Sequence, residues 1–480
     1  GEPLLEWLAA SGVGFGVLCE GDWEAAAASG GGRGEDDVFA GLRVGGGSGG
    51  RKALPAGTTR KVHKGYEEVA VPAAKVAPVG DAERFVAIEE LDDWAQLAFA
   101  GMTSLNRIQS KIYPAAFRSN ENLLVCAPTG AGKTNIAMLT VLHEIGAHFD
   151  DDGEWNGDDF KIVYVAPMKA LAAEVTNAFS RRLAPLGITV RELTGDTQLT
   201  KKELEETTMI VTTPEKWDVI TRKGGEVSVA STLGLLIIDE VHLLNDERGP
   251  VIETLVARTH RQVETTQSMI RIVGLSATLP NPMDVAKFLG VSDAGLFVFD
   301  QSYRPIPLTQ VFVGVTEGNA MKRLNLMAEI AYDKCAGALK SGKQAMVFVH
   351  SRKDTVKTAR QLAELAANAE GGVELFGCAE DDEGKKRFKT EIDRSRNNEL
   401  KELVGKGFGC HNAGMLRSDR TLVEKLFAAG VVKVLVCTAT LAWGVNLPAH
   451  TVVIKGTQLY DPQKGGFRDL GVLDVQQIFG

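Results

Sequence analysis

The sequence predicts an α/β protein of two domains, each built around a doubly wound parallel sheet. Short β-rich runs alternate with segments of helical periodicity along most of the 480 residues, and such alternation is typical of strand–helix–strand units with parallel strands. The alternation forms two series, one before and one after about Asp300. A chain of this length suits two or three domains, so the two series predict two sheets.

The first series contains five apolar or β-branched runs of strand length. They are Asn122–Ala127, Lys161–Val165, Met209–Thr212, Leu235–Ile238 and Arg271–Leu275. Apolar residues at helical spacing lie between these runs. Ile136, Leu139 and Leu142 fall on one face of a helix expected over Asn135–Ile145, and another helix is expected over Ala170–Leu183.

The second series repeats this plan after Asp300. Its expected strands are Ala345–His350, Phe408–Cys410, Val432–Cys437 and Thr451–Ile454, and its expected helices are Asp354–Asn368 and Arg417–Phe427. Between them, Gly371–Asn398 is charged and lacks a clear period. We expect this segment to be an inserted, poorly packed excursion.

The N-terminal part of the chain differs in composition from both series. Residues 25–50 are mostly Ala, Gly and Ser, which bury too little apolar surface to order a segment. We therefore expect residues 1–50 to be a low-complexity segment and residues 51–83 to be an extended arm on the domain surface. The two domains are expected over residues 84–300 and 301–480.

Composition and charge restrict the class of protein. The chain is 44% hydrophobic, its apolar runs are strand-sized, and its start does not resemble a signal peptide, so no membrane role is expected. Six scattered cysteines without a C-x-x-C pair indicate reduced intracellular thiols. The net charge of −9 disfavours nucleic-acid binding on average, but the acids crowd into a few presumed loops and tails. A locally neutral or basic groove is compatible with these numbers.

The segment LLVCAPTGAGKT, from Leu123 to Thr134, predicts a phosphate-binding loop between a strand and a helix. Backbone N–H groups from Thr129 to Gly132, with Gly130 and Gly132 permitting close approach, would face the phosphates. Lys133 would reach the β- and γ-phosphates, and the Thr134 hydroxyl would bind Mg²⁺. Ala127 occupies a position where such loops commonly have glycine, which indicates that no positive φ is needed there.

A second segment, LLIIDEVH from Leu235 to His242, ends a strand in two acidic residues. Asp239 would bind Mg²⁺, and Glu240 would orient and deprotonate the attacking water. Either segment alone can arise by chance, the acidic pair as the start of a solvated loop. Together, in this order and each behind a strand, they predict a site that binds and hydrolyses ATP.

Further motifs follow in a fixed order, and together they resemble the DExH-box helicases of superfamily two, in the Ski-like, Brr-like group. The resemblance runs from about Leu54 to Gly480. The motifs are LNRIQS at 105–110, APMKALAAE at 166–174, TGD at 194–196, TTPEKWD at 212–218, SAT at 276–278, FVHSR at 348–352, HNAGM at 411–415 and TATLAWGVNLPA at 438–449. The resemblance implies that both domains are RecA-like.

The resemblance also implies roles for individual residues. Gln109 would hydrogen-bond the adenine and Gly444 would contact the nucleotide, while the Ser276 and Thr278 hydroxyls would tie hydrolysis to domain movement. His242 has no second metal ligand at helical or strand spacing, so we expect it to couple the ATP state to the nucleic-acid groove. The residues expected to contact nucleic acid are Pro167, Lys169, Thr194, Gly195, Thr213, Ser351, Arg352 and Thr438.

The implied activity is ATP-dependent, 3′ to 5′ translocation and unwinding on single-stranded or partly duplex RNA or DNA. A larger multi-subunit complex in the nucleus or cytosol is implied as well. Preference for RNA or DNA stays open. We expect residues 460–467 to form a hairpin tip, either as a strand-separating wedge or as a plain surface hairpin.

The ends of the chain leave two alternatives to a complete helicase. The sequence begins with Gly1 and ends in QQIFG, before the family's final arginine motif, so we expect a fragment with a truncated second domain. Such a fragment would bind ATP and nucleic acid but hydrolyse ATP poorly. A phosphate-loop ATPase that is not a helicase is the other alternative.

Overall fold

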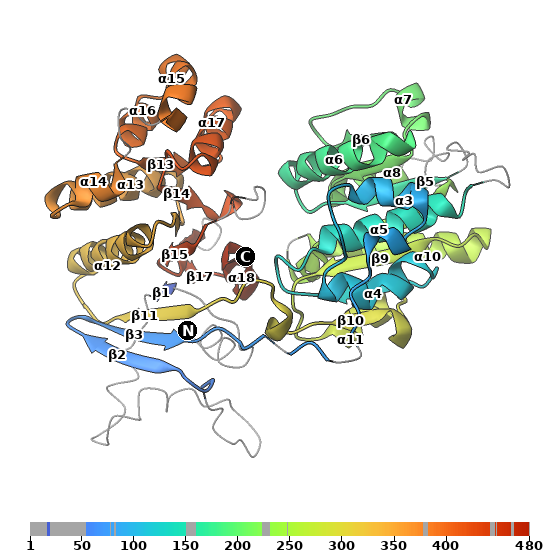
Figure 1. Cartoon of the computed structure of the whole chain (residues 1–480), viewed down its shortest axis with the longest axis horizontal. Helices are drawn as coiled ribbons and strands as arrows, with labels where there is room; N and C mark the ends of the chain where they lie inside the picture. Colours follow the sequence, from blue (N-terminus) through green and yellow to red (C-terminus); the bar gives the residue numbers. More distant parts are fainter. Residues whose placement is uncertain are drawn as a thin grey trace. The chain divides into compact units, whose positions relative to one another are not determined.

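The computed structural model describes residues 17–19, 54–76, 78–80, 83–149, 160–222, 231–246, 248–377, 383–441, 447, 449–461 and 465–479. The chain divides into two compact units (Figure 1). The central unit is Lys75–Pro307, and the split unit combines Gly1–Ala74 with Leu308–Gly480. No helix in the described ranges is long and apolar enough to cross a lipid bilayer.

The central unit contains a seven-stranded parallel sheet in the order β10-β4-β9-β8-β5-β7-β6. Its strands are β4 (Leu123–Cys126), β5 (Lys161–Val165), β6 (Val190–Leu193), β7 (Met209–Thr212), β8 (Leu233–Ile238), β9 (Arg271–Ser276) and β10 (Leu296–Val298). Every residue of β4, β5, β7 and β9 is buried. Since successive side chains point to opposite faces, both faces of the sheet are covered. The doubly wound class is confirmed.

The helices of the central unit mostly follow its strands, although the first two precede β4, and the two helices predicted over Asn135–Ile145 and Ala170–Leu183 are present. They are α3 (Asp93–Gln96), α4 (Arg107–Phe117), α5 (Lys133–Gly146), α6 (Lys169–Leu183), α7 (Lys201–Glu205), α8 (Pro214–Arg222), α10 (Gly249–Thr266) and α11 (Pro282–Phe288). A 3₁₀ helix, η4 (Val241–Asn245), follows β8. The carboxyl ends of the parallel strands therefore meet the helix starts at one edge of the sheet, where α/β proteins bind ligands.

The split unit contains an eight-stranded sheet in the order β13-β14-β12-β15-β1-β11-β3-β2. Its strands are β1 (Val17–Cys19), β2 (Thr59–His63), β3 (Tyr66–Val71), β11 (Gln310–Val315), β12 (Ala345–Val349), β13 (Phe408–His411), β14 (Val434–Thr438) and β15 (Thr451–Lys455). In β12, Ala345, Val347 and Val349 join one core cluster, while Met346 and Phe348 join another. The central strand β12 is thus buried on both faces, whereas the edge strand β2 is largely exposed.

The arm expected over residues 51–83 is a hairpin that extends this sheet. β3 pairs antiparallel with β11 and with β2, and the blue hairpin lies beside β11 in Figure 1. Val71 is buried in the split unit's core. Pairing is favoured because β11 would otherwise expose a row of backbone donors and acceptors. The strand β1 is a second difference, since it lies within the segment expected to be without structure and pairs with β11 and β15.

The segment expected to be a poorly packed excursion, Gly371–Asn398, is helical where the structure describes it. It contains α14 (Gly372–Phe376) and α15 (Glu383–Arg394), and α16 (Asn398–Gly405) follows. Phe376 is 1% exposed and stacks between Tyr332 and Phe408. The prediction was wrong because the helices are mostly charged and show no clear apolar period. Only a few large apolar side chains, such as Phe376, anchor them in the core.

The remaining helices of the split unit are α12 (Ala320–Lys340), α13 (Arg352–Asn368), α17 (Arg417–Ala428) and α18 (Val472–Phe479). A separate two-stranded sheet pairs β16 (Gln458–Asp461) with β17 (Gly466–Asp469). Tyr460 lies opposite Phe467, their rings 5.6 Å apart, and the two side chains are 60% and 72% exposed. The predicted hairpin is therefore present, with its aromatic pair facing solvent.

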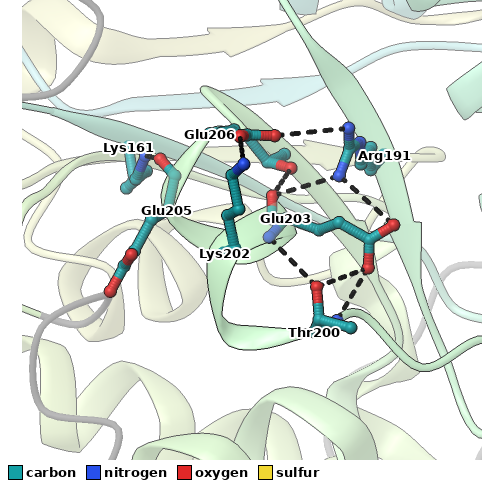
Figure 2. Close-up of polar contacts among 8 residues, drawn as sticks. Lys161, Arg191, Thr200, Lys202, Glu203, Glu205 and Glu206 are labelled. Carbon is teal, nitrogen blue, oxygen red and sulfur yellow. Dashed lines mark hydrogen bonds and ion pairs between the residues drawn. The ribbon is translucent and has the colours of Figure 1, made fainter.

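The short helix α7 is held by a polar cluster that closes the turn after the TGD motif (Figure 2). The Thr200 hydroxyl accepts from the Glu203 N–H at 3.3 Å, and the Glu203 carboxylate accepts from the Thr200 N–H at 2.8 Å, which is a capping box. Arg191 reaches Glu203 and Glu206 at 3.8 and 3.9 Å. Capping by Thr200 holds the pKa of Glu203 below its usual value.

We expect Thr200→Ala to destabilise the protein by about 0.5–2 kcal/mol, the usual cost of losing such a cap. Urea titration would measure the loss, and amide exchange would place it in α7. Thr265→Ala is the control, because Thr265 lies on the surface of α10 and bonds the Arg261 carbonyl. Equal exchange rates in α7 for Thr200→Ala and wild type would show that the cap does not stabilise this helix.

Candidate nucleotide-binding and catalytic site

The phosphate loop lies between β4 and α5, as the sequence predicts. Gly130 and Gly132 have φ values of 78° and 81°, which side chains on other residues disfavour. A Cβ on Gly132 would lie 2.3 Å from Nε2 of Gln109, so only glycine fits there. Ala127 has no positive φ and its N–H donates to the Ser276 carbonyl. It continues the strand pairing, which explains why glycine is unnecessary.

Helix α4 braces this loop from the side. Asn106 caps the helix, and its amide donates to the Ala131 carbonyl at 2.9 Å. Gln109 accepts from the Asn106 N–H at 3.0 Å and donates to the Gly132 carbonyl at 3.1 Å. Gln109 is 2% exposed. Its amide, predicted to read adenine, is therefore engaged with the loop in this structure, and a role toward adenine stays a proposal.

The first turn of α5 presents the two residues predicted to act on phosphate and metal. Lys133 donates from Nζ to the Ala127 carbonyl at 3.1 Å, so its ammonium folds back over the loop. Thr134 is exposed, as are Thr129 and Gly130 in the loop. The helix N-terminus and the ammonium together make a positive site suited to phosphate.

Strand β8 delivers the acidic pair to the same edge of the sheet. Asp239 accepts from the Tyr164 hydroxyl at 2.7 Å and from the Glu240 N–H at 2.9 Å. Burial and the neighbouring Glu240 raise the pKa of Asp239 to about 6. Burial also raises the pKa of Glu240, while Lys133 opposes that shift. Glu240 has φ 52°, a left-handed backbone that turns the chain from the strand into η4.

His242 joins the acidic pair to the SAT motif on the neighbouring strand β9. Its Nδ1 lies 3.3 Å from Oε2 of Glu240, accepts from the Ala277 N–H at 3.4 Å and lies 3.5 Å from the Ser276 hydroxyl. Burial and Lys133 lower the pKa of His242 to about 4, so the ring is neutral at neutral pH. A neutral ring with Nδ1 as acceptor fits the Ala277 contact better than an ion pair with Glu240. Thr278 is half-buried two residues after Ser276.

The expected nucleic-acid residues of the central unit differ in exposure. Lys169 and Gly195 are exposed, and Lys169 Nζ lies 2.6 Å from Oδ1 of Asp196. Thr194 is fully buried and its hydroxyl donates to Glu192. The hydroxyl of Thr194 is therefore engaged within the protein. Pro167 and Thr213 are also buried.

The split unit holds the other expected contacts. Ser351 caps α13 by accepting from the Asp354 N–H at 3.1 Å, and Arg352 is exposed at the helix start. Thr438 is half-buried at the end of β14. Gly444 lies outside the described residues.

Two residues that contact the site were not predicted. Asn106 had a detectable signal, because Asn followed by Gln three residues later is a helix-start pattern. Tyr164 had none, since a tyrosine in an apolar strand usually packs in a core. Its contact with Asp239 depends on the pairing of β5 with β8.

The donor set fits magnesium bound with a nucleotide. A hydroxyl on Thr134 and a carboxylate on Asp239 are hard oxygen ligands, and Mg²⁺ commonly takes one or two protein oxygens together with phosphate and water. The raised pKa values of Asp239 and Glu240 identify buried acids that a cation would stabilise as anions. No group of three or more His, Cys, Asp or Glu that could hold a metal occurs among the described residues.

A glycine loop between β4 and α5 and an acidic pair after β8 define a phosphate-loop nucleoside triphosphatase. Two family models match the chain, the DEAD/DEAH box helicase over residues 106–285 and the helicase conserved C-terminal domain over residues 383–477. The chain belongs to the DExH-box ATP-dependent helicases, and its relatives are consistent with the Ski-like group.

Three relatives show the level of similarity. A DExH-box ATP-dependent RNA helicase of Arabidopsis thaliana, DExH14, is 64% identical over 89% of this chain and 20% of its own length. Activating signal cointegrator 1 complex subunit 3 of Homo sapiens is 57% identical over 90% of this chain and 20% of its own. The human U5 small nuclear ribonucleoprotein 200 kDa helicase is 54% identical over 90% of this chain and 20% of its own length. The chain thus spans about a fifth of these relatives.

Solved structures support the fold. A DNA-bound DUF1998 helicase, MrfA, matches with a TM-score of 0.59 and 18% identity over 86% of this chain and 51% of that one.

Proposed function

We propose that the chain is the ATP-driven motor of a helicase that moves 3′ to 5′ along a nucleic-acid strand. The observation that carries this proposal is His242, whose Nδ1 lies 3.3 Å from Oε2 of Glu240 and accepts from the Ala277 N–H in the SAT segment. A change at Glu240 during hydrolysis would thereby be transmitted through the His242 ring to the end of β9. A phosphate-loop ATPase without a motor function has no need of this link.

The site residues divide the work of hydrolysis. Lys133 and the loop N–H groups hold the phosphates, and Thr134 and Asp239 hold Mg²⁺, which neutralises charge that develops on the phosphoryl oxygens. Glu240 accepts the proton of the attacking water. Gln109 keeps Gly132 in place and contacts adenine when the nucleotide binds. A role for Gly444 toward the nucleotide stays an implication of the resemblance, since this residue lies outside the described ranges.

The nucleic acid is a single-stranded or partly duplex RNA or DNA, held by its phosphates. Lys169, Gly195, Ser351 and Arg352 are exposed and contact the strand directly. Four further residues are buried or half-buried and hold the protein backbone beside the nucleic-acid strand: Pro167, Thr194, Thr213 and Thr438. Contacts to phosphate give binding that does not depend on sequence.

The β16–β17 hairpin acts where the duplex opens. Tyr460 and Phe467 offer exposed ring faces on which an unpaired base can stack in place of its lost neighbour. The relatives' names include an RNA helicase, a subunit of a complex and a ribonucleoprotein helicase, so we assign the chain to a multi-subunit complex in the nucleus or cytosol.

The test is ATP hydrolysis with and without single-stranded RNA and single-stranded DNA, for this chain and for a chain extended at its C-terminus through an arginine motif like that of the family. We expect at least one polymer to stimulate the extended chain. Hydrolysis by the extended chain that ignores both polymers would favour an ATPase that is not a helicase. Binding of ATP and RNA without turnover by this chain, alongside an active extended chain, would favour the binding-only alternative for the chain.

A further inference from the structure

Tyr164 contacts Asp239, the proposed magnesium ligand, from the neighbouring strand. It is the fourth residue of β5 and lies opposite Ile237 of β8, two positions before Asp239. Its side chain is 1% exposed, and its hydroxyl donates to Oδ2 of Asp239 at 2.7 Å. The Glu240 N–H donates to Oδ1 at 2.9 Å. Each oxygen of this carboxylate therefore has one protein donor.

Two donors on two oxygens fix the plane of the carboxylate. A single donor would leave rotation about the Cβ–Cγ bond, and a rotated carboxylate presents its lone pairs in other directions. The Tyr164 ring is itself held by packing against Phe179 of α6, with ring centroids 5.8 Å apart. The phenol is therefore a rigid donor, which is how partners behind a metal ligand usually set its orientation.

The hydroxyl has little use in packing alone. Tyr164 lies in an apolar core cluster that also contains Phe160 and Phe179, where phenylalanine would fill nearly the same space. A buried phenol needs a polar partner, and the partner it has is Asp239. The polar atom is thus placed at the carboxylate that would bind magnesium.

We propose that Tyr164 is a positioning residue that orients Asp239 for the magnesium ion of bound nucleotide. The proposal rests on the proposed function, because it requires a magnesium-nucleotide site at Asp239. The hydroxyl of Tyr164 would thus contribute to binding of the nucleotide with its magnesium ion. Binding of the nucleotide without metal would depend on the phosphate loop alone.

The test is Tyr164→Phe, which removes one oxygen and keeps the ring. Binding of a fluorescent ADP, mant-ADP, is measured with Mg²⁺ and with EDTA, and Mn²⁺ binding to the ADP complex is measured by electron paramagnetic resonance. We expect affinity in Mg²⁺ and for Mn²⁺ to fall by about 10–100-fold, as for other residues behind a metal ligand. Affinity in EDTA should match wild type. Tyr332→Phe, in the split unit, is the control. Its mant-ADP affinity with Mg²⁺, its mant-ADP affinity with EDTA and its Mn²⁺ affinity should all match wild type.

Four outcomes would overturn the proposal, the last of them together with the proposed function. Tyr164→Phe with wild-type dependence on Mg²⁺ would show that the hydroxyl does not position Asp239. A loss of mant-ADP affinity in EDTA as large as the loss in Mg²⁺ would show that Tyr164 stabilises the whole pocket instead. If Tyr332→Phe lost as much affinity in Mg²⁺ as Tyr164→Phe, the effect would not be specific to the hydroxyl of Tyr164. A wild-type protein that binds mant-ADP equally with Mg²⁺ and EDTA would instead refute the proposed function, and the inference with it.

Discussion

Glu240→Gln is expected to slow ATP hydrolysis by about 10²–10⁴-fold, the usual contribution of a positioned general base, while the protein still binds ATP. Glutamine keeps the size of the side chain but cannot accept the proton of the attacking water. The left-handed backbone at Glu240 tolerates glutamine as well as glutamate. Single-turnover hydrolysis and nucleotide affinity, measured together, separate the two effects.

The matched control is Glu253→Gln, an exposed glutamate on α10. It carries the same change of charge and should keep wild-type turnover. If Glu240→Gln turned over ATP at the wild-type rate, Glu240 would not be the base. If it lost nucleotide binding in the same proportion as turnover, Glu240 would instead be needed to hold the pocket together.

Lys133→Ala is expected to reduce turnover by about 10²–10³-fold, the usual loss when one donor to a developing charge is removed. Nucleotide affinity should fall as well, because the ammonium binds phosphate in the ground state. A further effect follows from the electrostatics. Lys133 lowers the pKa of both Asp239 and Glu240, so its removal favours the protonated, inactive forms of the two acids.

Lys201→Ala controls for the loss of one positive charge, since Lys201 lies on α7 with 87% of its side chain exposed. Steady-state hydrolysis and mant-ADP affinity should be unchanged in this variant. Wild-type turnover in Lys133→Ala would refute the assignment of the phosphate loop. A drop of equal size in Lys201→Ala would point to a general effect of net charge.

The sequence predicted the buried strands well and the edges of the sheets poorly. Lys161–Val165 and Met209–Thr212 match β5 and β7 residue for residue, because central parallel strands are continuous apolar runs. β6 was missed because Arg191 and Glu192 stand in its middle, where an edge strand tolerates polar side chains.

Gln109, Tyr164 and Thr194 show the limit of motif reasoning. Gln109 was found by its motif, yet its contact with Gly132 was not, since the motif carries no information about which partner the amide selects. Tyr164 carried no motif. Thr194 was assigned to nucleic acid from its motif, which does not reveal that its side chain is buried, and the assignment stays a prediction.

The sequence by itself determined the fold class, the phosphate loop and the acidic pair. These features depend on local patterns, namely apolar runs, glycines and the residues that directly follow a strand. Only the tertiary structure decided which side chains meet at the site. The contacts of Gln109 with Gly132, Asn106 with Ala131 and Tyr164 with Asp239 join residues 23, 25 and 75 positions apart. The Tyr164 contact arises from the order and register of β5 and β8, and the other two contacts arise from the packing of α4 beside the phosphate loop.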